Sequence, residues 1–333
     1  MINNRINFIS EIASSHTGKV SDVIKLSKLH IKSNSNYLKY QIFKTENLYP
    51  KNEKNFSKYK KLEIEYSKWK KIINKFKKKT NLILEPFDEE SYNFCKKFKK
   101  FVALKISTTE TDNFDLIDDA IKNFKKIFLN LSGFNEREIN LILKKLKNKR
   151  YYSKIILMYG FQSYPSNPEK MRFNLFKKFQ KNKFIYGYAD HSIYGLSNNL
   201  ISCAFLALIF RCAYFEKHVC LDIKKKPNDY ISSVHFPDFN KLINKVKLTE
   251  LIYLNSNRLN NFSKEEQKYA EEMHKKAFTN LHFKKNSKIK YKDLIFLRSK
   301  KKGGFKRLDV YKKILTSKKN ISSKKFLKKS DIK

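Results

Sequence analysis

Residues 186–222 decide the fold and read YGYADHSIYGLSNNLISCAFLALIFRCAYFEKHVCLD. A β-prone run at 184–188 is followed by an apolar segment at 200–210 that predicts a helix, and a second β-prone run follows at 213–215. The first run stops at Asp190-His191 and the second at Glu216-Lys217-His218, so polar residues follow each. Strand, helix and strand, with polar groups at the carboxyl end of each strand, is how a parallel α/β barrel builds an active site.

Two histidines follow these strands, one βα unit apart. His191 comes after the first strand and His218 after the second, so both imidazoles can face one cavity. Neutral imidazole is a good ligand for manganese, iron or zinc, and water or substrate can take the remaining positions. The alternative is a pair of loop histidines hydrogen-bonded to the backbone. A metal site is favoured because an acid, Asp190 or Glu216, precedes each histidine and could orient its imidazole.

The same alternation of strands and helices extends over the first three quarters of the chain. Eight strands are predicted at 6–12, 37–43, 82–87, 102–106, 127–131, 155–159, 184–188 and 213–215. Helices are predicted at 20–32, 64–79, 89–99, 114–124, 136–146, 172–181, 196–210 and 239–254. Eight βα units with short connections predict a (β/α)8 TIM barrel. A six-stranded doubly wound sheet is the alternative, but no glycine-rich dinucleotide-binding motif follows the first strand.

The character of the sequence changes after residue 255. We predict a barrel domain at 1–255, a charged linker at 256–273, and a small, mostly-β domain at 274–333. The last region contains short β-like pieces, turns and the pair Gly303-Gly304.

Composition limits the classes of function. The net charge of +42 would suit a nucleic-acid-binding protein, but the lysines are spread over every predicted helix, which favours solvated helix surfaces over a specific nucleic-acid site. The four cysteines have no metal-binding spacing, so we expect buried free thiols. The amino terminus lacks the apolar core of a signal peptide, and no apolar run is long enough to span a bilayer. We therefore expect a cytoplasmic protein with no membrane partner.

Lys39 and Lys105 are the lysines that we place inside predicted strands. A lysine that points into a barrel must meet an anion or form a Schiff base, because an unpaired buried ammonium group is costly. Two such lysines favour a phosphate or carboxylate ligand. The alternative is that both lie outside the barrel, among the helices.

An ordered set of motifs resembles those of the sialic acid synthases over essentially the whole chain. The motifs are EIASSHTG (11–18), LKYQ (38–41), EPFDEES (85–91), ALKISTTE (103–110), LSGF (131–134), QSYPS (162–166), YADHS (188–192), FEKHVCLD (215–222) and PNDYISS (227–233). DLIFLRSKKKGG (293–304) is similar to part of the family's small antifreeze-like (SAF) domain. The resemblance implies an N-acetylneuraminate synthase-like transferase that condenses phosphoenolpyruvate with N-acetylmannosamine or a related amino sugar, for sialic acid biosynthesis.

The resemblance also implies roles for individual residues. His191 and His218 match ligands of a divalent metal, for which manganese is expected and magnesium or cobalt are alternatives. Lys39 and Lys105 match lysines that hold phosphoenolpyruvate. Residues that match the substrate-binding and proton-transfer positions are Glu11, Gln41, Thr108, Glu110, Gln162, Tyr164, Asp229 and Arg298. Glu11 or Glu110 would handle protons. Arg298 matches an arginine that the small domain places over the partner subunit's site, which implies a domain-swapped homodimer.

Some positions depart from the family's pattern. Glu85, Leu131 and Ala189 stand where the family usually presents small hydroxyl residues to the phosphate, and Gln162 stands where asparagine is common. A carboxylate at Glu85 would repel a phosphate unless Lys39 or Lys105 neutralises it. The first hypothesis is therefore a metal-dependent nonulosonic (sialic) acid synthase. The alternatives are a divergent barrel with an altered donor and a catalytically silent binding subunit.

Overall fold

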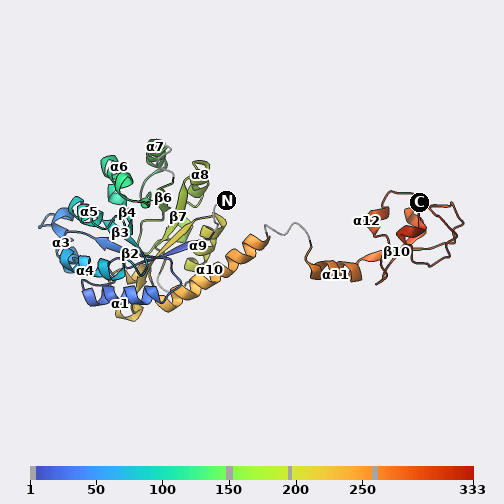
Figure 1. The fold of residues 1–333 in the computed structure, drawn as a ribbon, viewed down its shortest axis with the longest axis horizontal. Helices are drawn as coiled ribbons and strands as arrows, with labels where there is room; N and C mark the ends of the chain where they lie inside the picture. The colour runs from blue at the N-terminus through green and yellow to red at the C-terminus, as the bar shows by residue number, and fades with distance from the viewer. Residues whose placement is uncertain (1–4, 148–152, 194–196, 257–261) are drawn as a thin grey trace. The chain divides into compact units, whose positions relative to one another are not determined.

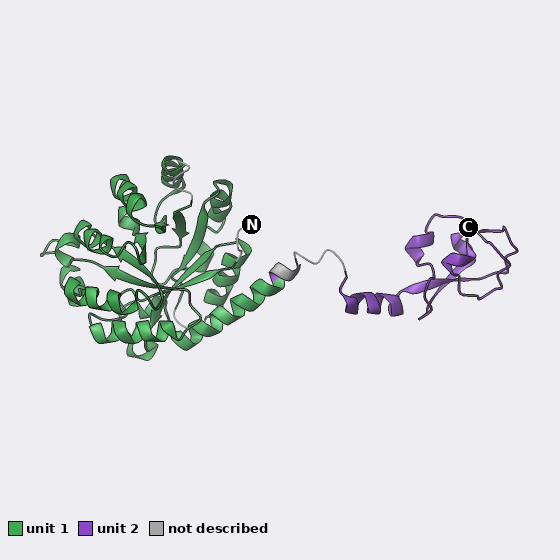
Figure 2. Cartoon of the chain, in the orientation of Figure 1, with its two compact units in different colours: residues 1–252 green, residues 253–333 purple. Residues whose placement is uncertain are grey.

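A computed structural model describes residues 5–147, 153–193, 197–256 and 262–333. The chain divides into two compact units, residues 1–252 and 253–333 (Figure 2). The boundary between the units lies close to the end of the predicted barrel at residue 255. Residues 257–261 of the predicted linker lie outside the described residues.

The first unit is a closed (β/α)8 TIM barrel, as the sequence predicted (Figure 1). All neighbouring strands pair in parallel, and the first strand also pairs with the eighth, which closes the cylinder. The strands are β1 (Asn7–Glu11), β2 (Tyr37–Ile42), β3 (Asn81–Pro86), β4 (Val102–Ile106), β5 (Ile127–Asn130), β6 (Ile155–Tyr159), β7 (Ile185–Asp190) and β8 (Tyr214–Cys220). A short strand, β9 (Ser233–His235), extends the sheet beside β8.

Helices surround the strands, mostly within a few residues of the predicted bounds (Figure 1). They are α1 (Val20–Ile31), α2 (Thr45–Leu48), α3 (Phe56–Leu62), α4 (Tyr66–Phe76), α5 (Glu89–Lys96), α6 (Phe114–Asn123), α7 (Glu136–Leu146), α8 (Leu175–Lys181), α9 (Asn198–Ile209) and α10 (Phe236–Ser256). Local sequence explains their starts: Asp88 caps α5, and Asn135 with Glu138 forms a capping box at α7. Leu196, the predicted first residue of α9, lies outside the described residues.

Side chains alternate between the barrel interior and the surrounding helices along each strand. On β2, Leu38 and Tyr40 pack in the apolar layer shared with the helices. Tyr37 packs with the interior core formed by Ile9, Ile83, Ala103, Phe128, Ile156, Met158, Ala189 and Tyr214. Lys39 lies two residues after Tyr37, so it points to the same interior. Gly187 also faces this space, where a Cβ atom would lie 2.7 Å from the sulfur of Met158.

The eighth strand is longer than the sequence predicted. We expected it to end at Phe215, but β8 continues through Glu216, Lys217 and His218 to Cys220. Lys217 therefore lies in a strand, and Lys39 and Lys105 are not the barrel's only strand lysines. Lys217 points outward, where its ammonium group lies 2.6 Å from the carboxylate of Asp190. Both side chains are fully buried, so this pair stabilises the outer face of the sheet without reaching the interior.

The second unit contains two helices, short strands and a small core of its own. Its elements are α11 (Lys264–Met273), β10 (Lys275–Thr279), β11 (Lys288–Ile289), β12 (Leu294–Arg298), α12 (Arg307–Val310) and β13 (Leu315–Thr316). Strand β10 pairs with β12 and β11 with β13, both antiparallel. Ala277, Ile289 and Leu327 lie at the centre of the core and are fully buried.

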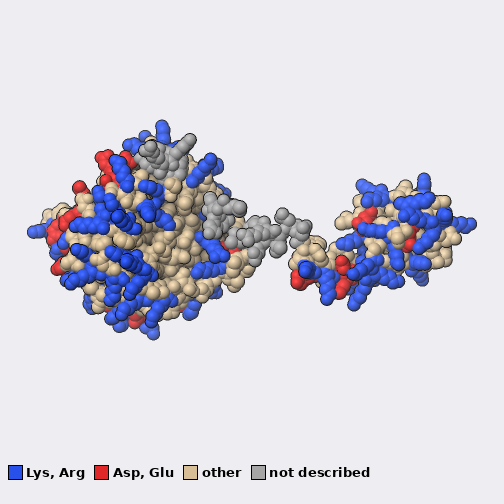
Figure 3. Space-filling model, in the orientation of Figure 1, with Lys and Arg blue, Asp and Glu red and all other residues tan. Residues whose placement is uncertain are grey.

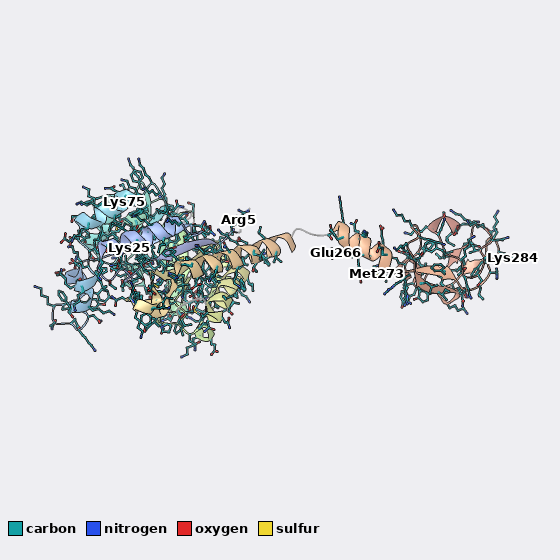
Figure 4. All side chains as sticks on the ribbon, turned by 90° about the horizontal axis from the view of Figure 1, so that it is seen from below. Arg5, Lys25, Lys75, Glu266, Met273 and Lys284 are labelled. Carbon is teal, nitrogen blue, oxygen red and sulfur yellow. The ribbon has the colours of Figure 1, made fainter. Side chains whose placement is uncertain are left out.

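Basic side chains are scattered over the visible face of both units (Figure 3). Lys25 on α1 and Lys75 on α4 are exposed examples on different helices (Figure 4). This distribution agrees with the expectation of solvated helix surfaces. The four cysteines are buried free thiols, as predicted. Among the described helices, none combines the length and the apolar composition that crossing a membrane requires.

Candidate active site

Two lysines reach the interior from strands β2 and β4. Lys39 lies on the inward side of β2, and Lys105 lies two residues after Ala103, which belongs to the interior core. The residues on either side of Lys105, Leu104 and Ile106, pack outward in the layer shared with the helices. The period of two along a strand therefore places both ammonium groups inside the barrel, and the alternative outside position is wrong.

Three buried carboxylates surround these lysines. Lys39 Nζ lies 2.8 Å from Glu85 Oε2 and 2.8 Å from Glu216 Oε1, and it also pairs with Glu11. Lys105 Nζ lies 2.7 Å from Glu216 Oε1 and 3.7 Å from Glu85 Oε1. Burial opposes charge on Lys105, but Glu216 and Glu85 outweigh it and raise its pKa. Burial likewise opposes charge on Glu216, yet the two lysines hold its pKa well below the usual range.

The two histidines face each other beside this cluster. The ring centroids of His191 and His218 lie 5.4 Å apart, and the rings are nearly perpendicular. His191 Nδ1 lies 3.2 Å from the carbonyl oxygen of Phe161, and His218 Nδ1 has no hydrogen-bond partner among the described residues. Burial lowers the pKa of His191 to about 4. Burial and the neighbouring His191 also lower the pKa of His218, so both imidazoles are neutral near pH 7.

The acids that precede the histidines do not orient them, which corrects the prediction from sequence. Asp190 accepts hydrogen bonds from Lys217, Ser192 and Tyr188, and it lies on the outward side of β7. Glu216 faces inward, but its partners are Lys39 and Lys105. Both acids are therefore counter-ions of buried lysines.

The histidine pair fits a divalent metal that takes only two protein ligands. Neutral imidazole is the ligand form of histidine, and the unpartnered Nδ1 of His218 is a buried polar atom that a ligand would satisfy. The described residues contain no group of three or more histidine, cysteine, aspartate or glutamate side chains arranged to hold a metal. Water or substrate oxygens would therefore complete the coordination of an ion held by His191 and His218.

A cavity of about 490 Å³ opens over the lysines and histidines. The predicted site residues that line it are Lys39, Gln41, Lys105, Thr108, Glu110, Gln162, Tyr164, His191 and His218. Gln162 connects two of them: its amide nitrogen donates to Thr108 Oγ1 at 3.0 Å, and its amide oxygen accepts from the Tyr164 hydroxyl at 3.0 Å. The ring centroids of Tyr164 and His191 lie 4.7 Å apart. The strand ends thus bring most of the predicted site to one mouth of the barrel.

Three predicted residues are not among those that line the cavity. Glu11 is fully buried, pairs with Lys39 and accepts from the backbone nitrogen of Ala13. Asp229 accepts from the backbone nitrogen of Ser14 at 3.0 Å, and burial raises its pKa. Arg298 is exposed on β12 of the second unit, so the first unit alone does not contain it.

One wall of the cavity was missed by the sequence analysis. Asn47, Leu48, Tyr49 and Tyr59 line it from the connection between β2 and α4, which contains the unpredicted helices α2 and α3. The rings of Tyr49 and Tyr59 lie 5.0 Å apart. The available signal was the length of this connection, because a long βα loop at the carboxyl end of a barrel strand is typically functional.

The family model described as "NeuB family" matches residues 17–258. The chain belongs to the NeuB family. The match covers nearly all of the barrel, including both lysines and both histidines of the cavity.

Known proteins similar to this NeuB-family chain agree in sequence or fold. It is 25% identical over 256 residues to the N,N'-diacetyllegionaminic acid synthase of Campylobacter jejuni, covering 72% of this chain and 75% of that protein. A solved N-acetylneuraminic acid synthetase of Leptospira borgpetersenii has a TM-score of 0.68 and 22% identity, covering 81% of this chain and 93% of that one. A structure described as spore coat polysaccharide biosynthesis protein E of Chromobacterium violaceum has a TM-score of 0.82 and 16% identity, covering 99% and 100%. The two structural likenesses show the fold.

Proposed function

We propose that this NeuB-family chain is a metal-dependent nonulosonic acid synthase. It would condense phosphoenolpyruvate with an N-acetylmannosamine-like amino sugar and release inorganic phosphate. The observation that supports this proposal is the convergence of two buried lysines and two neutral histidines on one cavity. The name of the Campylobacter jejuni relative, a legionaminic acid synthase, supports the same class of product.

The side chains divide the work by charge. Lys39 and Lys105 present ammonium groups that would hold the anionic donor and stabilise charge as phosphate leaves. A divalent metal bound by His191 and His218 would supply Lewis-acid chemistry, with manganese the first candidate. In the balanced reaction, C3 of phosphoenolpyruvate bonds to the sugar's aldehyde carbon, whose oxygen gains a proton. Water adds to C2 and supplies the oxygen of the new keto group as the bond between C2 and the phosphate oxygen breaks. Of the two protons that this water loses, one balances the proton gained by the sugar oxygen and the other leaves with the phosphate.

The geometry favours Glu110 over Glu11 for proton transfer. Glu110 lines the cavity, and its Oε2 accepts a hydrogen bond from Asn113 at 3.1 Å. Glu11 is fully buried and tied to Lys39, so it would position that lysine instead. We assign Glu110 to the proton that the sugar oxygen gains, and Gln41, Thr108, Gln162 and Tyr164 to substrate binding.

The direct test is release of inorganic phosphate from phosphoenolpyruvate, with manganese and a panel of N-acetylhexosamines. We expect release with at least one N-acetylmannosamine-like sugar and none without sugar. An absence of release across the panel, with manganese shown to be bound, would remove the proposal. Micromolar binding of phosphoenolpyruvate by calorimetry would argue against the alternative of a catalytically silent subunit.

The second unit enters the proposal through Arg298. By resemblance, this unit is an antifreeze-like (SAF) domain that completes the site of a partner subunit in a homodimer. Mixing Arg298→Ala with His218→Ala subunits should then restore about a quarter of wild-type activity, since half of the random dimers are mixed and each contains one intact site. Neither variant alone should be active. Mixed samples without activity, although shown to exchange subunits, would exclude the shared site.

A further inference from the structure

The charges around the two cavity lysines do not balance. Glu11, Glu85 and Glu216 contribute three carboxylates against the two ammonium groups of Lys39 and Lys105. Each of the five residues is at most 3% exposed, so water screens these charges weakly. Before any metal ion binds, this part of a site proposed for an anionic donor therefore has one more carboxylate than ammonium groups.

The three carboxylates have different places. Glu11 lies outside the cavity lining and is held by Lys39 and the backbone nitrogen of Ala13. Glu216 places one oxygen, Oε1, within 2.8 Å of both ammonium groups, which makes it the shared counter-ion of the pair. These two acids match the two lysines in number.

Glu85 is the third carboxylate, and it contacts the lysines as a ligand would. It lines the cavity and points one oxygen to each lysine, Oε2 to Lys39 at 2.8 Å and Oε1 to Lys105 at 3.7 Å. Gln41 Nε2 also lies 3.3 Å from Glu85 Oε2. A bound phosphate or carboxylate would need these same donors.

We propose that Glu85 is an internal anion that competes with the donor for Lys39 and Lys105 and thereby sets the donor affinity of this site. The inference rests on the proposed function, because it takes the lysine pair as the donor site. Phosphoenolpyruvate has to displace Glu85 from at least one ammonium group or bind against its charge. Glu85 is thus a specificity-determining residue, which weakens binding of highly charged anions relative to a site with two acids.

The test compares phosphoenolpyruvate affinity among charge variants by titration calorimetry in metal-free buffer. Glu85→Gln keeps the size of the side chain and removes its charge, Glu85→Ser also removes its bulk, and Glu85→Asp keeps the charge. We expect Kd to fall about tenfold or more in the first two variants and to stay within threefold in the third, since a unit charge about 4 Å from the ligand acts in a poorly screened site.

Glu136→Gln is the matched control. It removes the same net charge from a carboxylate that pairs with Lys178 and does not line the cavity. Its Kd should stay within twofold of wild type. Circular dichroism and the unfolding temperature show which variants are folded, and Glu85→Gln serves if Glu85→Ser is not.

The outcomes separate the inference from the proposed function. Folded Glu85→Gln and Glu85→Ser proteins that bind no tighter, while wild type releases phosphate, would overturn the inference alone. Tighter binding in both variants without turnover of any sugar would support the inference and overturn the synthase. An absence of phosphoenolpyruvate binding in every protein, both without metal and with manganese added, would overturn both.

Discussion

A buried or half-buried lysine lies at each end of the barrel interior, and the groups that contact it differ between the two ends. At the amino-terminal end, Lys126 Nζ donates to the hydroxyls of Tyr37 at 2.6 Å and Tyr214 at 3.1 Å. The ring of Phe128 packs 5.0 Å from that of Tyr214, so aromatic side chains fill this end. At the carboxyl-terminal end, Lys39 faces carboxylates below an open cavity.

The difference lies in which polar groups are satisfied. The amino-terminal end pairs its ammonium group with neutral hydroxyls and closes around it. The carboxyl-terminal end leaves Glu216 Oε2 and His218 Nδ1 buried without hydrogen-bond partners among the described residues. Because unsatisfied buried groups cost stability, their presence at one end indicates that this end is built for a ligand. The alternation of side chains along the strands places inward-facing residues at both ends. Those at the amino-terminal end stabilise the fold, and those at the carboxyl-terminal end are available to a ligand.

The largest expected effect tests the charge network at the carboxyl-terminal end. Lys39→Met would leave three buried carboxylates beside a single ammonium group, so we expect the free energy of unfolding to fall by about 3–5 kcal/mol. Urea denaturation measures it. Lys25→Met, on the exposed face of α1, should change it by less than about 0.5 kcal/mol. Adding Glu85→Gln to Lys39→Met should recover part of the loss, and a fully stable single variant would show that the ammonium group is not needed there.

The next prediction concerns a buried histidine that lies at neither end of the barrel interior. His30 is buried between Ser10 and Thr80, away from the cavity, and burial lowers its pKa from 6.5 to about 4. The unfolded chain therefore binds more protons between these values. Stability from the neutral ring is complete above pH 6.5 and declines as pH falls to 4, by about 3 kcal/mol. Burial also lowers the pKa of His16 to about 4, so the two contributions add.

Urea denaturation across this pH range measures the effect of His30. The slope of unfolding free energy against pH should be shallower in His30→Gln than in wild type, with the contribution of His16 remaining. An identical slope in both proteins would mean that folding does not change the pKa of His30.

His218→Ala should show the reverse of His30→Gln. Loss of the imidazole that we propose to coordinate the metal should lower phosphate release by more than about a hundredfold, since loss of a group that merely supports a ligand already costs 10–100-fold. The free energy of unfolding should change by less than about 1 kcal/mol, because the removed ring has an unsatisfied nitrogen. His30→Gln should lose stability and keep its activity. Equal losses of activity in the two variants would show that activity does not distinguish His218, which lines the cavity, from His30, which does not.

The sequence predicted the barrel and most of the cavity because both depend on local periodicity. The predicted strands contained Lys39 and Lys105, and the predicted strand ends placed His191 and His218 at one mouth, whereas the inward position of the lysines came from the structure. The prediction that Glu216 orients the imidazole of His218 was wrong. It assumed that the strand stops at Glu216, its first charged residue. Whether a charged strand residue is tolerated depends on a distant partner, here Asp190 for Lys217, and local propensity does not contain that information.

The wall formed by α2 and α3 was beyond prediction for a related reason. These helices are short, and Glu63 holds the segment by accepting from the backbone nitrogen of Thr45 and from Lys44 and Lys60. Contacts between residues far apart in the segment, and not a helical repeat, decide its shape. Its tyrosines therefore reached the cavity without any signal beyond the length of the connection.

The smallest expected effect tests the amino-terminal end itself. Lys126→Met keeps the apolar stem of the side chain and removes two hydrogen bonds to tyrosine hydroxyls, so we expect a loss of about 1–2 kcal/mol in unfolding free energy. Lys122→Met, exposed on α6, is the control and should be neutral. The kcat/KM for phosphate release should stay within twofold, because Lys126 lies just before β5 and the cavity opens after the strands end. A tenfold loss of activity without loss of stability would show that this end takes part in the chemistry, and a lysine satisfied by neutral hydroxyls would then no longer mark a purely structural site.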